Sequence, residues 1–355
     1  MSVGQAGAVK VDVHLDGDIP PEHINSVVVD RDVNQPDQAV IVLSNSDHRY
    51  SKKSLSGKVE IAIGDQGKSI YVGEIVGLEP SMKGGDKSTI TIRAYNKVHR
   101  LLRIRKSMTY KDKTDQQILE QVVKDAGLTL AYKHEKNITY KHVYQHNQNG
   151  LEFLRTRSAR MGCHMWCVDS TVNVKQIDLQ QAPSCEIRMQ EGVGESGLQL
   201  RSFTPRVSGS QVAKKMTCKG WNPETKELIN GEYSAQASRL GSTPAHEACG
   251  EHGKEENFMV DHPIWSKEEA DALAKAKLID ANLTYMTGEA ECIGDPQFDI
   301  AKVVKIMCNP DEGNDTFNGG YYVMGLTYRY SPGGKDKGGG FVSHLRLARD
   351  AQNGS

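Results

Sequence analysis

The sequence predicts a mainly β fold, in which two runs of short strands flank a mixed α/β insert. Within residues 1–100, several segments alternate apolar and polar residues, which is the period of a half-buried strand. Between residues 101 and 204, apolar residues recur at helical spacing instead. The chain has 34 glycines in 355 residues and only 6% aromatic residues, a balance that suits short strands and many turns.

The first hundred residues carry the clearest strand patterns. Valine and leucine alternate with polar residues over 11–15, and a continuous apolar run at 40–43 is typical of a strand buried on both faces. Alternation returns over 59–63, then over 70–73 and 90–94, with turn-forming residues between these segments. Five or more short strands at this spacing predict a barrel or a sandwich, because closure removes exposed sheet edges.

The insert begins with two predicted helices. Thr114 and Gln117 have the spacing of a capping box, and the apolar residues that follow up to 126 fall on one helical face before Gly127. A second helix is expected to begin near Asn149 and to stop at Gly162. An alternating strand over 163–167 follows directly, so this part of the chain is mixed α/β.

Strands return after the insert. Alternation over 212–218 ends at a turn at 222–225, and the polar stretch 234–256 reads as a long loop. Ser266 and Glu269 form another capping box, which opens a helix over 266–283. Further strands are expected at 303–306, 321–328 and 341–347. Val303 and Val323 should pack in the core there, as Val59, Ile61 and Ile63 should in the first unit.

These patterns divide the chain into four parts. Residues 1–100 form a first β domain, 101–204 the mixed insert, 205–347 a second β domain with its helix, and 348–355 a flexible tail. We expect the two β domains to be separate units and not one continuous sheet. The insert should lie to one side, where it can meet neighbouring proteins.

Composition excludes several classes of partner. The formal net charge of −1 favours neither nucleic acid nor a membrane surface as a partner. No apolar run approaches the roughly 20 residues of a membrane-spanning helix, and the N-terminus has no secretory pattern. Seven scattered cysteines, an odd number, indicate reduced thiols and synthesis in the cytoplasm.

Three glycine-containing segments resemble ligand loops but lack their context. The segment 192–197 matches a dinucleotide fingerprint, yet a predicted strand follows it where a helix N-terminus is required. The segment 84–89 has an aspartate where a phosphate loop needs glycine. The acidic turn 311–315 lacks the ligand alternation of a calcium loop. All three read as connectors or hairpins.

Two groups of histidine and cysteine are candidate metal sites, and both are rejected. Cys163 and Cys167 share one strand face, while His164 points to the other, which favours simple packing. The second group is His246, Cys249 and His252, in a stretch rich in glutamate. It supplies only three nearby ligands, so solvated polar residues are the favoured interpretation.

A basic stretch at 97–113 is the remaining candidate binding surface. It holds seven lysines and arginines with tyrosines nearby, a combination that can follow a nucleic-acid backbone. The same charges could instead pair with an acidic neighbour in an assembly, and Asp112, Asp115 and Glu120 lie close in sequence. The chain has no GxSxG elbow and no HExxH helix. We therefore predict no catalytic, cofactor-binding or metal-binding residue.

Several segments, taken in order along the chain, carry a family pattern. They are 94–101, 110–118, 143–147 with the Glu-Phe-Leu helix at 151–154 and Gly162, 218–223 with Lys226 and Gly231, 294–296, and 318–323. In this order they resemble the late-control protein D family of phage tails, which shares its fold with the hub part of type VI secretion spike proteins (VgrG). The resemblance spans nearly the whole chain.

The resemblance implies a structural baseplate hub with no enzymatic activity and no cofactor. It implies two related β-barrels per subunit with a helix-bearing insert, and a homotrimer whose six barrels match a hexameric inner tube on one side and a trimeric spike on the other. The implied partners are the inner tube or tube-initiator protein, baseplate wedge proteins and a spike on a separate chain, since 355 residues leave no room for the spike's β-helix. The protein is made in the cytoplasm and becomes part of the tail or injection particle.

The pattern departs from the family at two places, and two other functions stay open. Ala301 stands where the family has glycine, and Tyr328 where histidine is frequent, which leaves the local turn and packing open. A baseplate-associated cell-wall hydrolase would need two facing carboxylates in a pocket. An oligonucleotide-binding barrel would need salt-sensitive binding of single strands. The sequence does not distinguish phage, bacteriocin, secretion and extracellular injection systems.

Overall fold

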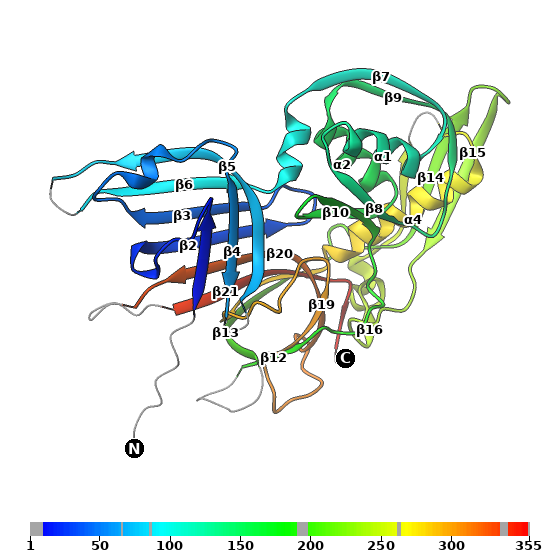
Figure 1. Ribbon diagram of the computed structural model, residues 1–355. Coiled ribbons are helices and arrows are strands. Elements are labelled where there is room, and N and C mark those ends of the chain that lie inside the picture. Colours follow the sequence, from blue (N-terminus) through cyan, green and yellow to red (C-terminus); the bar gives the residue numbers. More distant parts are fainter. Residues whose placement is uncertain are drawn as a thin grey trace.

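The computed structural model describes residues 10–64, 67–84, 87–189, 198–260, 264–333 and 340–353. The chain forms two lobes (Figure 1): a large twisted sheet on one side, and a lobe with the long helices and several small sheets on the other. The predicted fold class, mainly β with barrels and a helix-bearing middle domain, is confirmed. Within the described ranges no helix has both the length and the apolar character needed to cross a membrane. The glycine segment 192–197 lies outside the described residues.

The first β unit has six strands, hydrogen-bonded in the order β1-β4-β5-β6-β3-β2. They are β1 (Val11–Leu15), β2 (Ile24–Asp32), β3 (Gln38–Ser44), β4 (Lys58–Ile63), β5 (Lys68–Ser81) and β6 (Thr89–Tyr95). Two short 3-10 helices, η1 (Pro21–His23) and η2 (Arg49–Lys52), lie in the connections. Val59, Ile61 and Ile63 are at most 1% exposed, so their predicted inward orientation is confirmed.

The second β unit also has six strands, and it closes into a barrel. They are β12 (Glu186–Met189), β13 (Leu198–Val207), β18 (Met286–Ile293), β19 (Val303–Met307), β20 (Gly319–Ser331) and β21 (Gly340–Arg349). Closure occurs because β20 pairs with both β19 and β21. Val303 and Val323 are buried as predicted. The predicted boundary at 204/205 falls inside β13, because β12 and β13 complete this barrel's ring.

The two units are related by an internal duplication of strand order. Strands β2 to β6 have the same neighbours, all antiparallel, as β13 and β18 to β21 taken in the same sequence order. Even the irregularities agree. A bulge between Ile24 and Ser26 of β2 recurs between Leu200 and Ser202 of β13. The first strands differ, since β1 runs antiparallel to β4 whereas β12 runs parallel to β19.

A second bulge fixes the correspondence between β5 and β20. Gly77 follows the bulge in β5 and lies opposite Arg93 on β6. Gly325 follows the bulge in β20 and lies opposite Arg346 on β21. Bulges bend a strand and set where its pairing changes partner. Two bulges and the registers around them therefore assign equivalent positions residue by residue.

The turn before β4 and the turn before β19 are also equivalent. Ala301 has a φ of +57° and its N–H donates to the carbonyl of Val323 at 2.9 Å. In the first unit Ser56 has a φ of +71° and its N–H donates to the carbonyl of Ile75 at 2.8 Å. A positive φ favours glycine, which explains why glycine is expected at position 301. The backbone shape is kept here without it.

The two β units are joined into one sheet, which corrects the expectation of separate units. β2 pairs antiparallel with β20 over six residues, from Val27 opposite Tyr330 to Asp32 opposite Gly325. The result is a single hydrogen-bonded sheet of 12 strands, and one hydrophobic core runs through both units. β2 would otherwise present an unpaired edge, and β20 satisfies its N–H and C=O groups.

The predicted helices of the insert are confirmed. α1 (Asp115–Lys124) and α2 (Gly150–Arg160) both begin with capping boxes, at Thr114 and Asn149. Gly127 has a φ of +72° and Gly162 of +65°, as helix-terminating glycines require. The helices pack against the ribbon of β7 (Arg105–Thr114) and β9 (Thr139–Asn149) and the sheet of β8 (Thr129–Lys133), β10 (Cys163–Val168) and β11 (Thr171–Gln176).

The segment after β13 differs from the prediction, because it leaves the barrel. β14 (Ala213–Asn222), β15 (Glu227–Ser234) and β17 (Lys254–Val260) form a separate sheet with α4 (Lys267–Leu283) on one face. The predicted loop at 234–256 contains β16 (Thr243–Pro244), α3 (Ala245–Ala248), η4 (Gly250–His252) and the start of β17. In the predicted tail, β22 (Ala351–Gln352) pairs with β16. These pairings are non-local, so local polarity gave no sign of them.

Gly231 lets α4 approach β15, and its substitution is expected to destabilise the chain. A Cβ added at position 231 would overlap the backbone of Ala270 and Asp271 on the helix. Gly231→Ala should therefore lower the free energy of unfolding by about 1–3 kcal/mol, measured by chemical denaturation. Gly313→Ala is the matched control, because nothing lies within 4 Å of a Cβ added there. Equal stability of the two variants would contradict this packing.

Candidate assembly surface

The predicted weak metal candidate sits on two short helical turns. His246 lies on α3, His252 lies on η4, and Cys249 joins them. Burial raises the pKa of the Cys249 thiol, which disfavours the thiolate that binds metals. Among the described residues, no three His, Cys, Asp or Glu side chains are arranged to hold an ion. That this chain binds no metal stays a prediction.

The cysteines of β10 are packed, as the strand pattern indicates. Cys163, Met165 and Cys167 belong to the insert's hydrophobic core. His164 points the other way, and its Nδ1 lies 2.9 Å from the hydroxyl of Tyr322 on β20. Burial lowers the pKa of His164 to about 4, so the ring is neutral at physiological pH. His164 therefore ties the insert to the second barrel.

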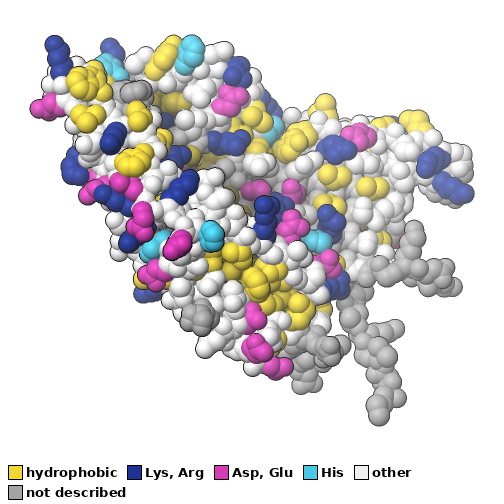
Figure 2. All heavy atoms as spheres, turned by 180° about the vertical axis from the view of Figure 1, so that it is seen from behind, with side chains coloured by type: hydrophobic (Ala, Val, Ile, Leu, Met, Phe, Trp, Pro, Cys, Tyr) yellow, Lys and Arg dark blue, Asp and Glu magenta, His cyan; other side chains and the backbone are white. Residues whose placement is uncertain are grey.

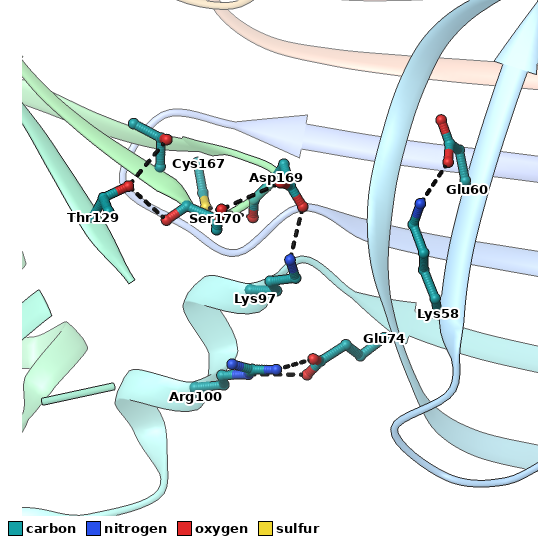
Figure 3. A network of polar contacts seen from close by, with 10 residues as sticks. Lys58, Glu60, Glu74, Lys97, Arg100, Thr129, Cys167, Asp169 and Ser170 are labelled. Carbon is teal, nitrogen blue, oxygen red and sulfur yellow. Dashed lines mark hydrogen bonds and ion pairs between the residues drawn. The ribbon is translucent and has the colours of Figure 1, made fainter. Parts of the chain in front are cut away.

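Four of the seven basic residues in this stretch form ion pairs with acidic residues of the same chain. At the junction of the lobes (Figure 3), η3 (Lys97–Leu102) places Lys97 2.8 Å from Asp169 on the β10–β11 turn. Arg100 on the same helix pairs with Glu74 of β5. These two pairs hold the insert against the first β unit. The sequence analysis offered an acidic neighbour in an assembly as the alternative partner, whereas the partners of Lys97 and Arg100 lie in the same chain.

Further along the stretch the charges are paired as well. Lys106 lies 2.7 Å from Asp125, and Arg105 lies 3.1 Å from Glu152. On the face shown in Figure 2, basic and acidic side chains are interspersed and no single-sign patch dominates. A nucleic-acid site needs a basic stripe that tracks the backbone. The geometry gives the oligonucleotide-binding alternative no support.

A groove of about 740 Å³ lies between the insert, α4 and the second barrel. Its carboxylates include Glu135, Asp178 and Asp350, the residues that a hydrolase reading would use. Glu135 is paired with Lys275 at 2.7 Å, and Asp350 accepts a hydrogen bond from Ser238 at 2.5 Å. Within the described residues no contact joins these carboxylates to one another. Glu135 and Asp350 are therefore engaged in contacts within the chain, and that this protein is no hydrolase stays a prediction.

Two strand edges of the large sheet lack a neighbour within the described residues. β4 covers one edge of β5 only as far as residue 74, and β6 covers the opposite edge. β13 pairs with β12 over residues 198–200 and with β18 along its other edge. This leaves one edge of β5 without a neighbouring strand at residues 77–81, and one edge of β13 without a neighbouring strand at residues 202–207. The equivalent edges, on β20 and β2, are covered because they pair with each other.

The open edges carry opposite charges and one proline each. On β5, Glu79 accepts a hydrogen bond from the Nε of Arg93 at 2.6 Å, which lowers the pKa of the Glu79 carboxyl. Pro80 follows it. On β13, Pro205 precedes Arg206, which is exposed and makes no ion pair in the described part of the chain. Local sequence patterns do not reveal these edges, because they carry no information on which strands pair.

Solved structures with this fold include several tail proteins. A tail protein from Neisseria meningitidis aligns with a TM-score of 0.71 at 13% identity, covering 97% of both chains. The 43 kDa tail protein of prophage MuSo2 from Shewanella oneidensis gives 0.68 at 14% identity, covering 98% of this chain and all of that one. A type VI secretion component from Escherichia coli gives 0.64 at 11% identity, covering 94% and 76%. At these identities the likeness establishes the fold.

Sequence comparison adds a family assignment. No curated protein matches the sequence significantly. One family model, described as the Alg8 N-terminal domain, matches residues 5–331, which is most of the chain. The chain belongs to the Alg8 N-terminal domain family.

Proposed function

We propose that this protein is the structural hub of a contractile tail or injection particle, in which three copies form a ring that connects the hexameric inner tube to the trimeric spike. Its partners are then the tube or tube-initiator protein, the spike on a separate chain, and baseplate wedge proteins. The protein is made in the cytoplasm and assembled into the particle. It carries no catalytic residue and no cofactor in this role.

The observation that carries the proposal is the internal duplication within one sheet. Two equivalent six-stranded units in each chain give six equivalent units in a trimer. Such a ring can present sixfold-like contacts to a tube while keeping threefold symmetry for a spike. The shared fold with tail proteins and a type VI secretion component supports the same role.

The proposal predicts a copy number of three. Purified protein should be trimeric by native mass spectrometry, and a map of the assembled particle should place three copies around the tube axis. The permanent ring contact should bury more than about 2,000 Å² per pair of copies. A stable dimer, or six copies in the particle, would contradict the proposal.

A further inference from the structure

The sheet of β14, β15 and β17 has one covered face and one uncovered face. α4 packs on the covered face, where it meets Met216 and Cys218 of β14. Successive side chains of a strand point to opposite faces, so Lys219 and Trp221 of β14 point away from the helix. In Figure 1, β14 and β15 lie at the outer end of the lobe with the long helices, away from β5 and β6.

The uncovered face gathers large apolar side chains at one end. Leu228 of β15 lies opposite Trp221, and Val260 of β17 lies opposite Lys219. Phe258 precedes Val260 by two residues and shares its face. The exposed fractions are 47% for Trp221, 61% for Leu228, 59% for Phe258 and 66% for Val260. Paired side chains on one face stand next to each other, so these four residues and Lys219 form one surface, the outer patch.

The outer patch is more than scattered exposure. It holds four of the twelve large apolar side chains that are exposed among the described residues, and all four lie on three adjacent strands. Single exposed apolar residues are ordinary, whereas a contiguous apolar patch with a polar rim marks a site of protein interaction. Tryptophan and phenylalanine are also enriched in the cores of such sites.

A lysine without a carboxylate partner lies within this apolar surface. The Lys219 Nζ lies 5.3 Å from the centroid of the Phe258 ring, over its face. Among the described residues Lys219 makes no ion pair, whereas Lys215, on the same face, is paired with Glu232 at 2.5 Å and with Glu256 at 3.7 Å. An unpaired cation that a partner removes from water requires an anion there. The outer patch therefore predicts a carboxylate in its occupant.

We propose that the outer patch binds another protein of the particle, through a surface on which apolar side chains surround one aspartate or glutamate. This inference rests on the proposed function, which supplies the particle. A further copy of the chain fits the patch poorly. Two outer patches related by a two-fold axis would bring Lys219 towards Lys219, and the exposed pair Leu102 and Ile104 has Arg103 between its members. Both arrangements place like charges together.

Photo-crosslinking in the assembled particle identifies the occupant. With p-benzoyl-L-phenylalanine in place of Leu228, irradiation of purified particles should give a covalent product with a different protein of the particle. Mass spectrometry of the crosslinked peptide should find apolar residues around an aspartate or glutamate. The matched control carries the same photoreactive residue in place of Lys214, which is exposed on the same strand but shares the face of Met216. It should not give this product.

Substitutions within the outer patch test its chemistry. K219E should lower the yield of the crosslinked product about tenfold, because it places a like charge against the carboxylate of the occupant. W221A should lower it about as much, because truncation of a central tryptophan removes a large share of the apolar contact. K214E is the matched control and should leave the yield unchanged. Circular dichroism melting confirms that each variant is folded.

Reversal of the identified carboxylate to lysine should restore the product with K219E, since the two charges are again opposite. A particle that contains this chain but gives no product from position 228, or a product only with a second copy, would overturn this inference and leave the proposed function standing. Unchanged yields for both K219E and W221A, or a crosslinked peptide without a carboxylate, would do the same. Absence of this chain from the purified tail or injection particle would overturn both.

Discussion

Ile61→Asp is expected to leave the chain unfolded. Ile61 is fully buried in the core of the first β unit, between Val13 on β1 and Tyr71 on β5. Its replacement removes burial worth about 1.5–3 kcal/mol. It also places a carboxylate without a partner in the core, at a cost of several kcal/mol more. The sum is comparable with the whole stability of a typical domain, about 5–15 kcal/mol.

The control is Ile104→Asp, because Ile104 is 64% exposed. That change should alter the free energy of unfolding by no more than about 0.5 kcal/mol. Ile306→Asp should be as damaging as Ile61→Asp, since Ile306 is the equivalent buried position in the second barrel. Circular dichroism and soluble yield measure all three. A folded Ile61→Asp protein would contradict the inferred core.

Local patterns were enough to predict most individual elements. Period-2 alternation placed β1 and β4, because one face of each strand is buried and the other is not. The N-cap residues Thr114, Asn149 and Ser266 marked helix starts, because their side-chain oxygens accept hydrogen bonds from N–H groups that the helix leaves unpaired. These signals act within a few residues, so the sequence contains them in full.

Pairing between distant segments could not be predicted in the same way. β14 has the alternation of a barrel strand, yet it pairs with β15 and β17 and packs under α4. The sequence of β14 itself contains no pattern that would indicate pairing with β15 and β17 and not with strands of the barrel. The junction of β2 with β20 joins residues about 300 positions apart. The predicted boundary at 204/205 falls inside a strand, and the two β units share one sheet instead of being separate. Both features depend on tertiary contacts that local patterns do not contain.

The duplication did leave a faint signal. Val76-Gly77-Leu78 of β5 and Met324-Gly325-Leu326 of β20 share an apolar-Gly-Leu pattern at the equivalent bulge. At Gly325 a Cβ would overlap the Arg346 guanidinium, whereas at Gly77 a Cβ would meet only the Cβ of Arg93, at 3.8 Å. Three residues are too few to reveal a repeat without the strand register. The open edges, which follow from that repeat, were therefore beyond the sequence patterns.

The pH dependence of stability should show two buried groups acting in opposite directions. The pKa of His164 is lowered from 6.5 to about 4 by burial. Below pH 6.5 the unfolded chain therefore binds a proton that the folded chain excludes. Stability should fall by about 3 kcal/mol as the pH decreases from 6.5 to 4.

Asp37 has the reverse effect. Burial raises its pKa from 3.8 to about 6, although Arg31 lies 3.3 Å from its carboxylate. Between pH 6 and 3.8 the folded chain binds a proton that the unfolded chain does not. Stability should therefore rise by about 3 kcal/mol as the pH falls through this window. Asp299, Tyr71 and Cys167 also interact electrostatically with Asp37, and Tyr328 interacts with its partner Arg31.

Single substitutions separate the two contributions. In Asp37→Asn only the His164 contribution of the two remains, so the free energy of unfolding should fall by about 3 kcal/mol from pH 6.5 to 4. In His164→Phe the Asp37 contribution remains, and stability should rise by a similar amount from pH 6 to 3.8. The measurement is urea unfolding at half-unit pH steps, with each variant compared with the wild type at the same pH. If both variants follow the wild-type curve at a constant offset, neither group titrates as its burial requires.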